Sequence, residues 1–359
     1  MKIRKIVKQT VALVALMALG IAPAIAGNGD RVGSAGATEL LINPWARSAA
    51  WASAGLSCSE GLDAVHLNIA GLAFTPKTQV RFDRTSWLGG SGININTAGL
   101  AQRVSDVGVI SVQVMAMSFG DIEITTVDVP EGGIGTFSPT YSNFQVGYSH
   151  KFTKSIYGGI GLKVINESIA NVRGTGIAID AGIRYVTGEQ DNIKFGISLK
   201  NVGPTMSFKG DGLALLVMYP ETEELATLEQ RSASFEMPSL LGIGASYDFI
   251  FSESAKLTLA GAFTANSFSN DQYSLGLNYA MDVKKAAFNI MAGYTFEKGV
   301  FKSTLDYGNR VTALTGFAAG VSVDAILGKN KNLMGIQYAY RLTRNFNGVH
   351  TVGLSLEIR

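Results

Sequence analysis

The chain has 359 residues, of which 47% are hydrophobic, 16% are charged and 42 are glycine. Disordered segments are typically highly charged and poor in hydrophobic residues, so this composition argues against disorder. It also lacks the basic stripes of nucleic-acid-binding proteins, and no nucleic-acid partner is expected. Beyond residue 26 the longest uncharged apolar run is Leu213–Tyr219, far shorter than the roughly 20 residues of a transmembrane helix. The composition therefore favours an apolar all-β protein.

The N-terminus has the pattern of a secretory signal peptide. A basic start is followed by the apolar stretch Val11–Ala22 and by the small-x-small sequence Ala24–Ala26. We therefore expect residues 1–26 to be removed as a signal peptide. The alternative, a membrane anchor, needs a longer apolar stretch. The single cysteine, Cys58, cannot form an internal disulfide and is interpreted as a small buried hydrophobe.

From residue 79 onward, apolar residues alternate with small or polar residues, as in Tyr273–Met281, which is typical of β-strands with two different faces. Most of the predicted strands are long enough to cross a bilayer at a tilt, which takes about 9–11 residues. Their number is even, as in bacterial outer-membrane barrels. The fourteen predicted strands lie near residues 79–87, 91–103, 107–126, 140–152, 155–168, 174–188, 191–203, 237–250, 255–267, 270–283, 285–297, 313–327, 331–344 and 347–359.

The connections between these strands alternate in length. Those at 127–139, 204–236 and 298–312 are long, whereas every second connection is short. Outer-membrane barrels have short periplasmic turns and long outer loops, and soluble sandwiches have no reason to sort their loops in this way. The sequence therefore predicts a transmembrane antiparallel β-barrel over residues 77–359, in the cell outer membrane, in contact with its lipid and with both termini in the periplasm.

Residues 27–76 do not alternate, although they contain many apolar side chains. A fourteen-stranded barrel has a lumen too wide for its own side chains to fill, since eight strands already fill theirs. We therefore expect this segment to be a plug, or hatch, inside the barrel. The alternative is a periplasmic N-terminal extension. The plug residues singled out are Asn43, Pro44, Trp45, Asn68, Ala70, Gly71 and Leu72.

Polar and charged residues occupy the inward parity of the predicted strands. They carry both signs, which argues against a selectivity ring of one charge. Hydrogen bonding to the plug and to one another is the expected role, and a substrate path with a lipid or detergent in the lumen is the alternative. The lumen residues singled out are Asp180, Arg184, Gln337 and Arg341.

The connection 204–236 contains an apolar run followed by acidic residues. An apolar patch on an outer loop is unusual unless it meets something. It is expected either to dock a partner protein or to fold back over the barrel mouth. The residues singled out for partner binding are Leu213, Leu215, Leu216, Val217, Met218 and Tyr219.

The sequence gives no indication of catalysis. His66, His150 and His350 are too scattered for a metal or acid–base site, and interfacial hydrogen bonding is expected for the last two. The glycine pairs lack the helix and the following Lys-Ser/Thr of a phosphate loop. Neither a cofactor, a metal nor an enzymatic activity is predicted.

Several short blocks resemble a known family. The opening of the PorV/PorQ family of Bacteroidetes outer-membrane proteins resembles three blocks of this chain, Gly36–Ile42, Ala46–Ala50 and Asn68–Leu72. The family's third strand and second outer loop resemble Phe119–Glu123 and Gly135–Pro139, and its last strand resembles Gly348–Leu356. The resemblance implies a FadL-like barrel of fourteen strands with an N-terminal hatch. It also implies a role in type IX protein secretion, in which the partner is a translocon subunit or the C-terminal signal domain of a secreted cargo.

Three functional hypotheses remain open at this point. The first is a protein-interaction barrel that binds a cargo signal domain or a translocon subunit through its outer loops, with the plug closing the pore. The second is a FadL-like uptake channel for hydrophobic small molecules. The third is a scaffold subunit of an outer-membrane assembly with no cargo of its own.

Overall fold

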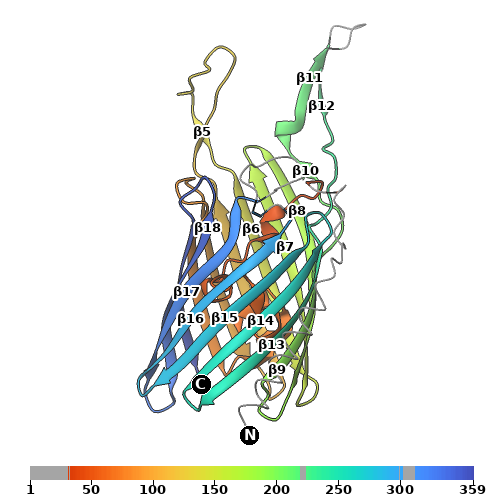
Figure 1. The fold of residues 1–359 in the computed structure, drawn as a ribbon. Helices are drawn as coiled ribbons and strands as arrows, with labels where there is room; N and C mark the ends of the chain where they lie inside the picture. Colours follow the sequence, from red (N-terminus) through yellow and green to blue (C-terminus); the bar gives the residue numbers. More distant parts are fainter. Residues whose placement is uncertain (1–30, 32, 219–223, 299, 302–311) are drawn as a thin grey trace.

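The computed structural model describes residues 31, 33–218, 224–298, 300–301 and 312–359. Within these residues, fourteen long strands form a closed antiparallel barrel in which each strand pairs with its neighbours (Figure 1). The predicted transmembrane β-barrel is confirmed. The barrel strands are β1 (Thr78–Ser86), β2 (Asn94–Arg103), β3 (Gly108–Ser118), β6 (Thr140–Lys151), β7 (Ile156–Ile169), β8 (Val172–Thr187), β9 (Ile193–Val202), β13 (Leu240–Ser252), β14 (Ala255–Asn266), β15 (Gln272–Val283), β16 (Ala286–Glu297), β17 (Leu314–Leu327), β18 (Asn332–Thr343) and β19 (Val349–Ile358).

The first and last strands close the barrel. β1 pairs with β19 along its whole length, from Thr78↔Ile358 to Ser86↔His350. Closure leaves no free strand edge and gives the backbone N–H and C=O groups of the wall partners without water. Three pairings shift register, between Ile179 and Ala181 in β8, between Ile250 and Ser252 in β13 and between Leu314 and Ala318 in β17.

The outer face of the wall is apolar because one parity of every strand carries aliphatic or aromatic residues. In β1, for example, Val80 and Phe82 are exposed whereas Arg81 and Asp83 are buried. Aromatic pairs lie near both ends of the strands, such as Tyr294 with Phe296. An apolar band between aromatic girdles is the usual lipid-facing surface of a transmembrane barrel.

The plug lies inside this barrel and consists of short helical turns. These are η2 (Thr38–Leu41), α2 (Ala46–Ala49), η3 (Ala54–Ser57), α3 (Leu62–Val65) and η4 (Ile69–Phe74). η4 contacts β3, β6, β7 and β8, η3 contacts β9, β13, β14 and β15, and α2 contacts β17, β18 and β19. Because these contacts reach strands around most of the ring, the plug occupies the middle of the lumen, as the warm-coloured chain in Figure 1 shows.

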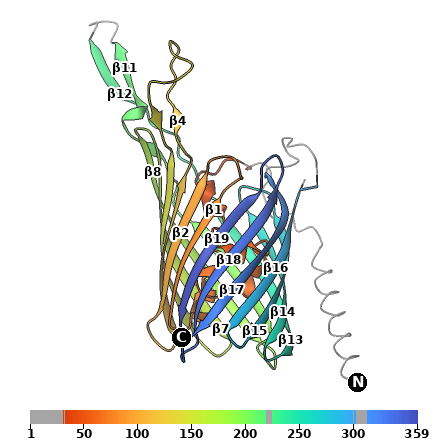
Figure 2. The same ribbon diagram turned by 90° about the vertical axis from the view of Figure 1, so that its left-hand side faces the viewer.

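The long connections lie at one end of the barrel and the short turns at the other, which also holds the C-terminus (Figure 2). We refer to these as the long-loop end and the short-turn end. Two fingers project beyond the long-loop end: residues 119–139, and residues 211–218 with 224–230 (Figures 1 and 2). The first contains β4 (Ile122–Glu123) and β5 (Thr136–Phe137); the second contains η5 (Asp211–Leu213), β11 (Ala214–Met218) and β12 (Leu225–Glu229). The short strand β10 (Phe208–Lys209) pairs with β8 below the second finger.

Two expectations about this end need correction. The strand predicted over 107–126 ends at Ser118, and Gly120 follows with φ 79°, a left-handed conformation that breaks the extended chain and starts the first finger. The alternative in which the apolar run folds over the mouth does not hold for its described residues: β11 pairs with β12 and stands away from the barrel (Figure 2).

No helix within the described ranges is both long and apolar enough to cross a membrane. The predicted signal peptide, residues 1–26, lies outside the described residues.

Candidate functional site

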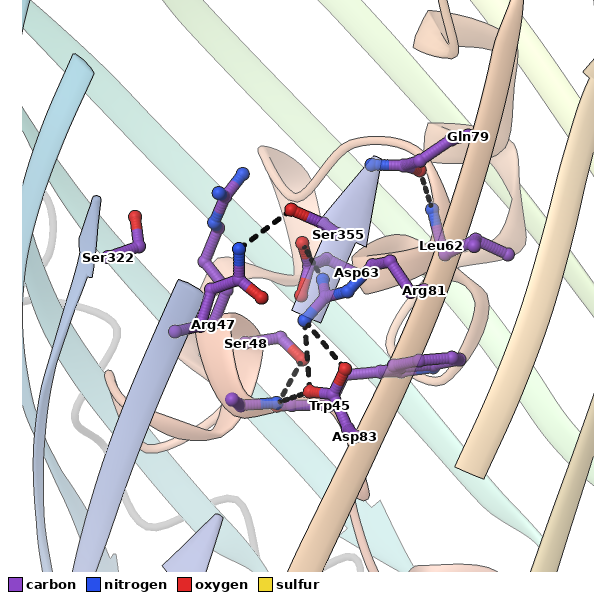
Figure 3. A network of polar contacts seen from close by, with 12 residues as sticks. Trp45, Arg47, Ser48, Leu62, Asp63, Gln79, Arg81, Asp83, Ser322 and Ser355 are labelled. Carbon is purple, nitrogen blue, oxygen red and sulfur yellow. Dashed lines mark hydrogen bonds and ion pairs between the residues drawn. The ribbon is translucent and has the colours of Figure 1, made fainter. Parts of the chain in front are cut away.

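A buried network of charges joins the plug to β1 (Figure 3). Arg81 forms an ion pair with Asp63 of α3 and a second with Asp83 at 3.0 Å, and its guanidinium lies 5.0 Å from the ring centroid of Trp45. Asp83 Oδ2 also accepts a hydrogen bond from the Ala46 backbone N–H at 2.6 Å, at the start of α2. The three charged side chains are at most 5% exposed, so each depends on the others for compensation.

Other inward side chains of the wall bind the plug backbone. Gln79 Oε1 accepts a hydrogen bond from Leu62 N at 2.8 Å (Figure 3). Arg184 Nη1 donates to Ser59 O at 2.9 Å, and Ser149 Oγ donates to Ala70 O at 3.1 Å. The wall therefore supplies the partners that these short helical turns cannot supply for themselves.

On the β14–β18 side, by contrast, the plug meets the wall through small residues. An added Cβ at Gly293 would lie 2.3 Å from Trp51 O, and one at Gly276 would lie 2.9 Å from Ala54 Cβ. A Cβ at Gly320 would lie 2.6 Å from Ala50 Cβ. Glycine is required here because the plug backbone approaches the wall too closely for a side chain. We call this contact the glycine seam.

Two cavities lie on this side of the lumen, one at each end. The inner cavity, about 840 Å³, is at the short-turn end and is lined by mixed charges that include Arg47, Asp324 and Arg359. The outer cavity, about 170 Å³, is at the long-loop end and is lined by Lys200, Arg341 and His66 together with apolar side chains. Plug residues Ala50–Ala54 occupy the glycine seam between the two cavities.

The predicted lumen residues all lie on the inner side, but not as one group. Asp180 forms an ion pair with Lys163 at 2.6 Å, whereas Arg184 binds Ser59 and Glu60 of the plug. Gln337 Nε2 donates to Ser355 Oγ at 2.8 Å. Nε and Nη2 of Arg341 are shielded from solvent and have no hydrogen-bond partner among the described residues, and its guanidinium lies 5.1 Å from the Trp87 ring centroid.

The predicted plug residues are all buried in the lumen. Asn43 Nδ2 donates to Ser48 Oγ and Ser53 Oγ, each at 3.0 Å, and Asn68 Nδ2 donates to Ile183 O of the wall at 3.0 Å. Asn68 Oδ1 caps η4 by accepting from Ala70 N at 3.1 Å. The other predicted plug residues, Pro44, Trp45, Gly71 and Leu72, are buried as well.

The predicted partner-binding residues lie on the second finger, except for Tyr219, which is outside the described residues. Leu213 ends η5, and the next residues form β11. Leu216 is 68% exposed and Met218 is 58% exposed, and Leu215 and Val217 are exposed as well. The described part of the run therefore keeps its apolar side chains in contact with solvent.

Sequence reasoning overlooked some of the most strongly buried charges. Arg81 and Asp83 lie on the inward parity of β1, between the outward Val80 and Phe82, and that pattern could have identified them. Lys163 could have been found in the same way in β7. Their partner Asp63 had no such indication, because a plug without periodicity does not reveal which side chains face the wall.

His66 lies in the plug beside the outer cavity, and its pKa is held well below its usual value. Burial is the main cause, followed by the positive charges of Lys200, Lys163 and Arg341, while a hydrogen bond to the Leu41 backbone opposes the shift. His66 is therefore neutral at pH 7. The other two histidines have ordinary structural roles: Tyr148 OH lies 3.0 Å from His150 Nδ1, and Tyr338 OH lies 2.8 Å from His350 Nδ1.

Comparison with known proteins gives matches to solved structures alone. No protein-family model matches the chain, and no curated protein sequence matches it. A Pseudomonas aeruginosa FadL homologue is similar over 88% of this chain and 98% of its own, with a TM-score of 0.55 and 10% identity. The Ralstonia pickettii toluene transporter TbuX is similar over 89% of this chain and 98% of its own, with a TM-score of 0.52 and 11% identity. The P. putida toluene transporter TodX is similar over 86% of this chain and 95% of its own, with a TM-score of 0.51 and 11% identity.

Identities near 10% establish the fold and nothing finer. Two of the neighbours named here are described as toluene transporters and the third as a FadL homologue, whereas the resemblance of the short sequence blocks to the PorV/PorQ family stays a prediction. Fourteen antiparallel strands closed around an N-terminal plug, matched over nearly the full length of those neighbours, give this chain the fold of the FadL-like barrels.

Proposed function

We propose that this protein is an outer-membrane channel that takes up small hydrophobic molecules, with the plug as its closed gate. The apolar outer face and the aromatic girdles support a place in a membrane. The long fingers would then face the outside and the short turns the periplasm. The named activities of the structural neighbours, toluene transport among them, are in keeping with this class of substrate.

The observation that carries the proposal is the pair of cavities on one side of the lumen. The outer cavity opens toward the fingers and the inner cavity toward the short turns. Among the described residues, the plug turn at the glycine seam lies between the linings of the two cavities. A small movement of residues 50–54 would join the two cavities into one path along β14–β18.

The sole cysteine offers a way to test this gate. η3 packs against β13, and Ser246 on that strand is one of the side chains that influence the buried Cys58 thiol. The substitution Ser246→Cys therefore places a second thiol where a disulfide can tie the plug to the wall. Uptake of radiolabelled toluene is measured in cells that lack other barrels of this fold, with the variant oxidised and then reduced.

Expression of the native protein should raise toluene uptake, oxidised Ser246→Cys should abolish the increase, and reduction should restore it. Ser246→Ala, which cannot form the disulfide, is the matched control and should behave as the native protein under both conditions. No increase with the native protein would refute the channel. Undiminished uptake by the oxidised variant would refute plug movement as the gate.

A second candidate function is favoured by the two fingers. We propose, as the alternative, that they dock a protein partner outside the cell. Residues 119–139 contain four acidic and no basic residues, and residues 211–230 contain five acidic and no basic residues. Both also expose aliphatic side chains, such as Ile134 (56%) and Leu216 (68%). This surface suits a basic partner with apolar patches; the PorV/PorQ resemblance suggests a type IX translocon subunit or a secreted cargo domain.

Deletion of residues 214–229 separates the two functions. The remaining ends are already adjacent, because Gln230 N donates to Leu213 O at 2.9 Å. If docking is the function, the deletion should abolish co-purification of a protein partner that the full chain retains in mild detergent. If the protein acts as a channel alone, toluene uptake should be unchanged and no partner should be lost.

A further inference from the structure

One edge of β11, on the second finger, is open and unprotected. β11 pairs with β12 from Ala214↔Glu229 to Met218↔Leu225, and no described residue pairs with its other edge. The hairpin stands away from the barrel, so the wall strands do not cover that edge (Figure 2). Natural edge strands are usually protected by charge, proline or a bulge, and Ala214–Met218 contains none of these. Such an edge is a template for pairing with another chain.

β11 is also apolar on both of its faces. Leu215 and Val217 lie on one face, and Leu216 and Met218 lie on the other, because successive side chains of a strand alternate. All four side chains are exposed. Strands that are apolar on both faces are typical of the interior of covered sheets, and a two-stranded hairpin alone is at best marginally stable in water. β11 therefore has the composition of an inner strand, although in this chain it lies at an edge.

Acidic residues lie at both ends of the hairpin. At the base of the finger Asp211 begins η5 and Glu229 ends β12, and at the tip Glu224 directly precedes β12. All three are exposed. Residues 209–231 contain five acidic and two basic side chains, and the two basic ones, Lys209 and Arg231, are the outermost residues of that range. A strand that pairs with β11 and carries basic residues at its two ends would meet opposite charge at each end.

A second copy of this chain does not suit the open edge. Two hairpins paired through β11 would bring their acidic ends together, and like charges across an interface disfavour association. The first finger is acidic as well, with no basic residue between positions 119 and 139, so it does not supply the complementary charge. The charge of the finger therefore favours a different, basic protein.

We infer that β11 is a strand-addition site, at which an extended segment of a partner protein, apolar in its middle and basic at both ends, pairs with the open edge of the hairpin. The inference rests on the proposed docking function of the fingers and names its binding mode and the chemistry of the partner. In this mode, backbone hydrogen bonds supply affinity and alternate side chains supply specificity. The added strand would make β11 the central strand of three, the position that its apolar faces fit.

The test is binding of synthetic peptides to the full chain purified in a mild detergent, followed by fluorescence anisotropy. The probe is a fluorescein-labelled peptide of alternating valine and threonine residues with two lysines at each end. One matched peptide has glutamates in place of the lysines. Another keeps the lysines and carries methyl groups on the backbone nitrogens of its central residues.

The lysine peptide should bind at least about tenfold more tightly than the glutamate peptide, because the acidic ends of the finger repel the latter. It should exceed the N-methylated peptide by a similar factor, because several backbone hydrogen bonds are lost. Equal affinity for the glutamate peptide would overturn the basic partner. Equal affinity for the N-methylated peptide would overturn strand pairing.

Variants of the fingers locate the site. Deletion of residues 214–229 should abolish binding of the lysine peptide, and undiminished binding would refute the inference. Glu224→Lys/Glu229→Lys should reverse the preference, so that the glutamate peptide binds more tightly, and an unreversed preference would refute the role of the acidic ends. Asp128→Lys/Glu131→Lys makes the same change at exposed positions of the first finger and, as the matched control, should keep the native preference. Heat-modifiable electrophoretic migration verifies that each variant has an intact barrel.

A second copy of the chain and a failure of docking give separate signals. Dimerisation of the native chain that the deletion abolishes would overturn the partner assignment, because a second hairpin would then occupy the edge. A protein partner that is lost on deletion, together with no binding of the lysine peptide, would refute strand addition and leave the docking function standing. Absence of any co-purifying partner would count against the docking function alone, because the peptide measurements do not depend on it.

Discussion

Removal of Arg81 should release the plug from the wall. The substitution Arg81→Met deletes the cation that pairs with both Asp63 and Asp83, whose side chains are 5% and 0% exposed. Removing one partner of a buried ion pair typically costs about 3–5 kcal/mol, because the remaining charges are left uncompensated. That free energy is lost from the closed state of the plug, while the wall keeps its own backbone pairing.

The sole cysteine reports this opening directly. Cys58 is 9% exposed in the native plug, and burial raises the pKa of its thiol, so a maleimide should react with it only when the plug opens. Each 1.4 kcal/mol changes an equilibrium about tenfold. An opening that costs about 3 kcal/mol less should therefore accelerate Cys58 labelling by roughly a hundredfold. Labelling is followed by mass spectrometry, and heat-modifiable electrophoretic migration verifies that the barrel is intact.

Two further variants sharpen the result. Lys256→Met removes an exposed partner of Asp248 at 3.8 Å and should change the labelling rate less than tenfold. The triple variant Arg81→Met/Asp63→Leu/Asp83→Asn removes the stranded charges and keeps an acceptor for Ala46 N–H, so it should recover slow labelling. Labelling of Arg81→Met within threefold of the native rate, with an intact barrel, would refute the view that this network holds the plug.

Three further predictions concern the seam, acid and the second finger. Gly293→Ala puts a Cβ 2.3 Å from Trp51 O and should accelerate Cys58 labelling by about five- to a hundredfold. Gly261→Ala, whose Cβ meets Leu275 Cδ2 at 3.3 Å and Ser274 O at 3.8 Å, should not accelerate it, and equal rates would contradict the seam as a tight contact. Because the folded pKa of His66 is depressed, the unfolded state binds more protons below about pH 6.5, so stability falls as pH falls. The ratio of the native Cys58 labelling rate to the rate of His66→Gln should therefore rise by up to about tenfold per pH unit as the pH is lowered from 6.5 to 5. An unchanged ratio would mean that Lys200, Lys163 and Arg341 do not oppose protonation of His66. Deletion of residues 214–229 should shift the melting temperature by less than about 2 °C, since β11 and β12 pair with each other and not with the wall, and a larger shift would show that the finger braces the barrel.

The barrel wall was predictable from the sequence because the alternation of inward and outward side chains is visible within each strand. In β1 the alternation of Val80 and Phe82 with Arg81 and Asp83 follows directly from lipid on one side and plug on the other. The count of fourteen strands and the sorting of long and short connections followed from the same pattern. The end of β3 at Ser118 was missed because Ile122 and Ile124 continue the alternation after Gly120 has turned the chain.

The plug was predictable only as a segment. Its residues lack periodicity, and their positions depend on partners over a hundred residues away, as in Asn68 with Ile183 and Arg47 with Asp324. The surroundings of Lys200 and Arg341 were equally hidden, because both lie on the expected inward parity and the packed lumen decides which inward charges meet. Sequence patterns identify the face of a residue, whereas pairing across the lumen is set by three-dimensional closure.

The brevity of the plug helices has a consequence for biogenesis. α2, η3 and α3 have four residues each, too few for a helix to be stable on its own in water. Their backbone groups depend on Gln79, Asp83 and Arg184, which are brought together only when the strands have joined into a cylinder. The plug segment, although it precedes the strands in the sequence, must therefore order last, during or after closure of the ring.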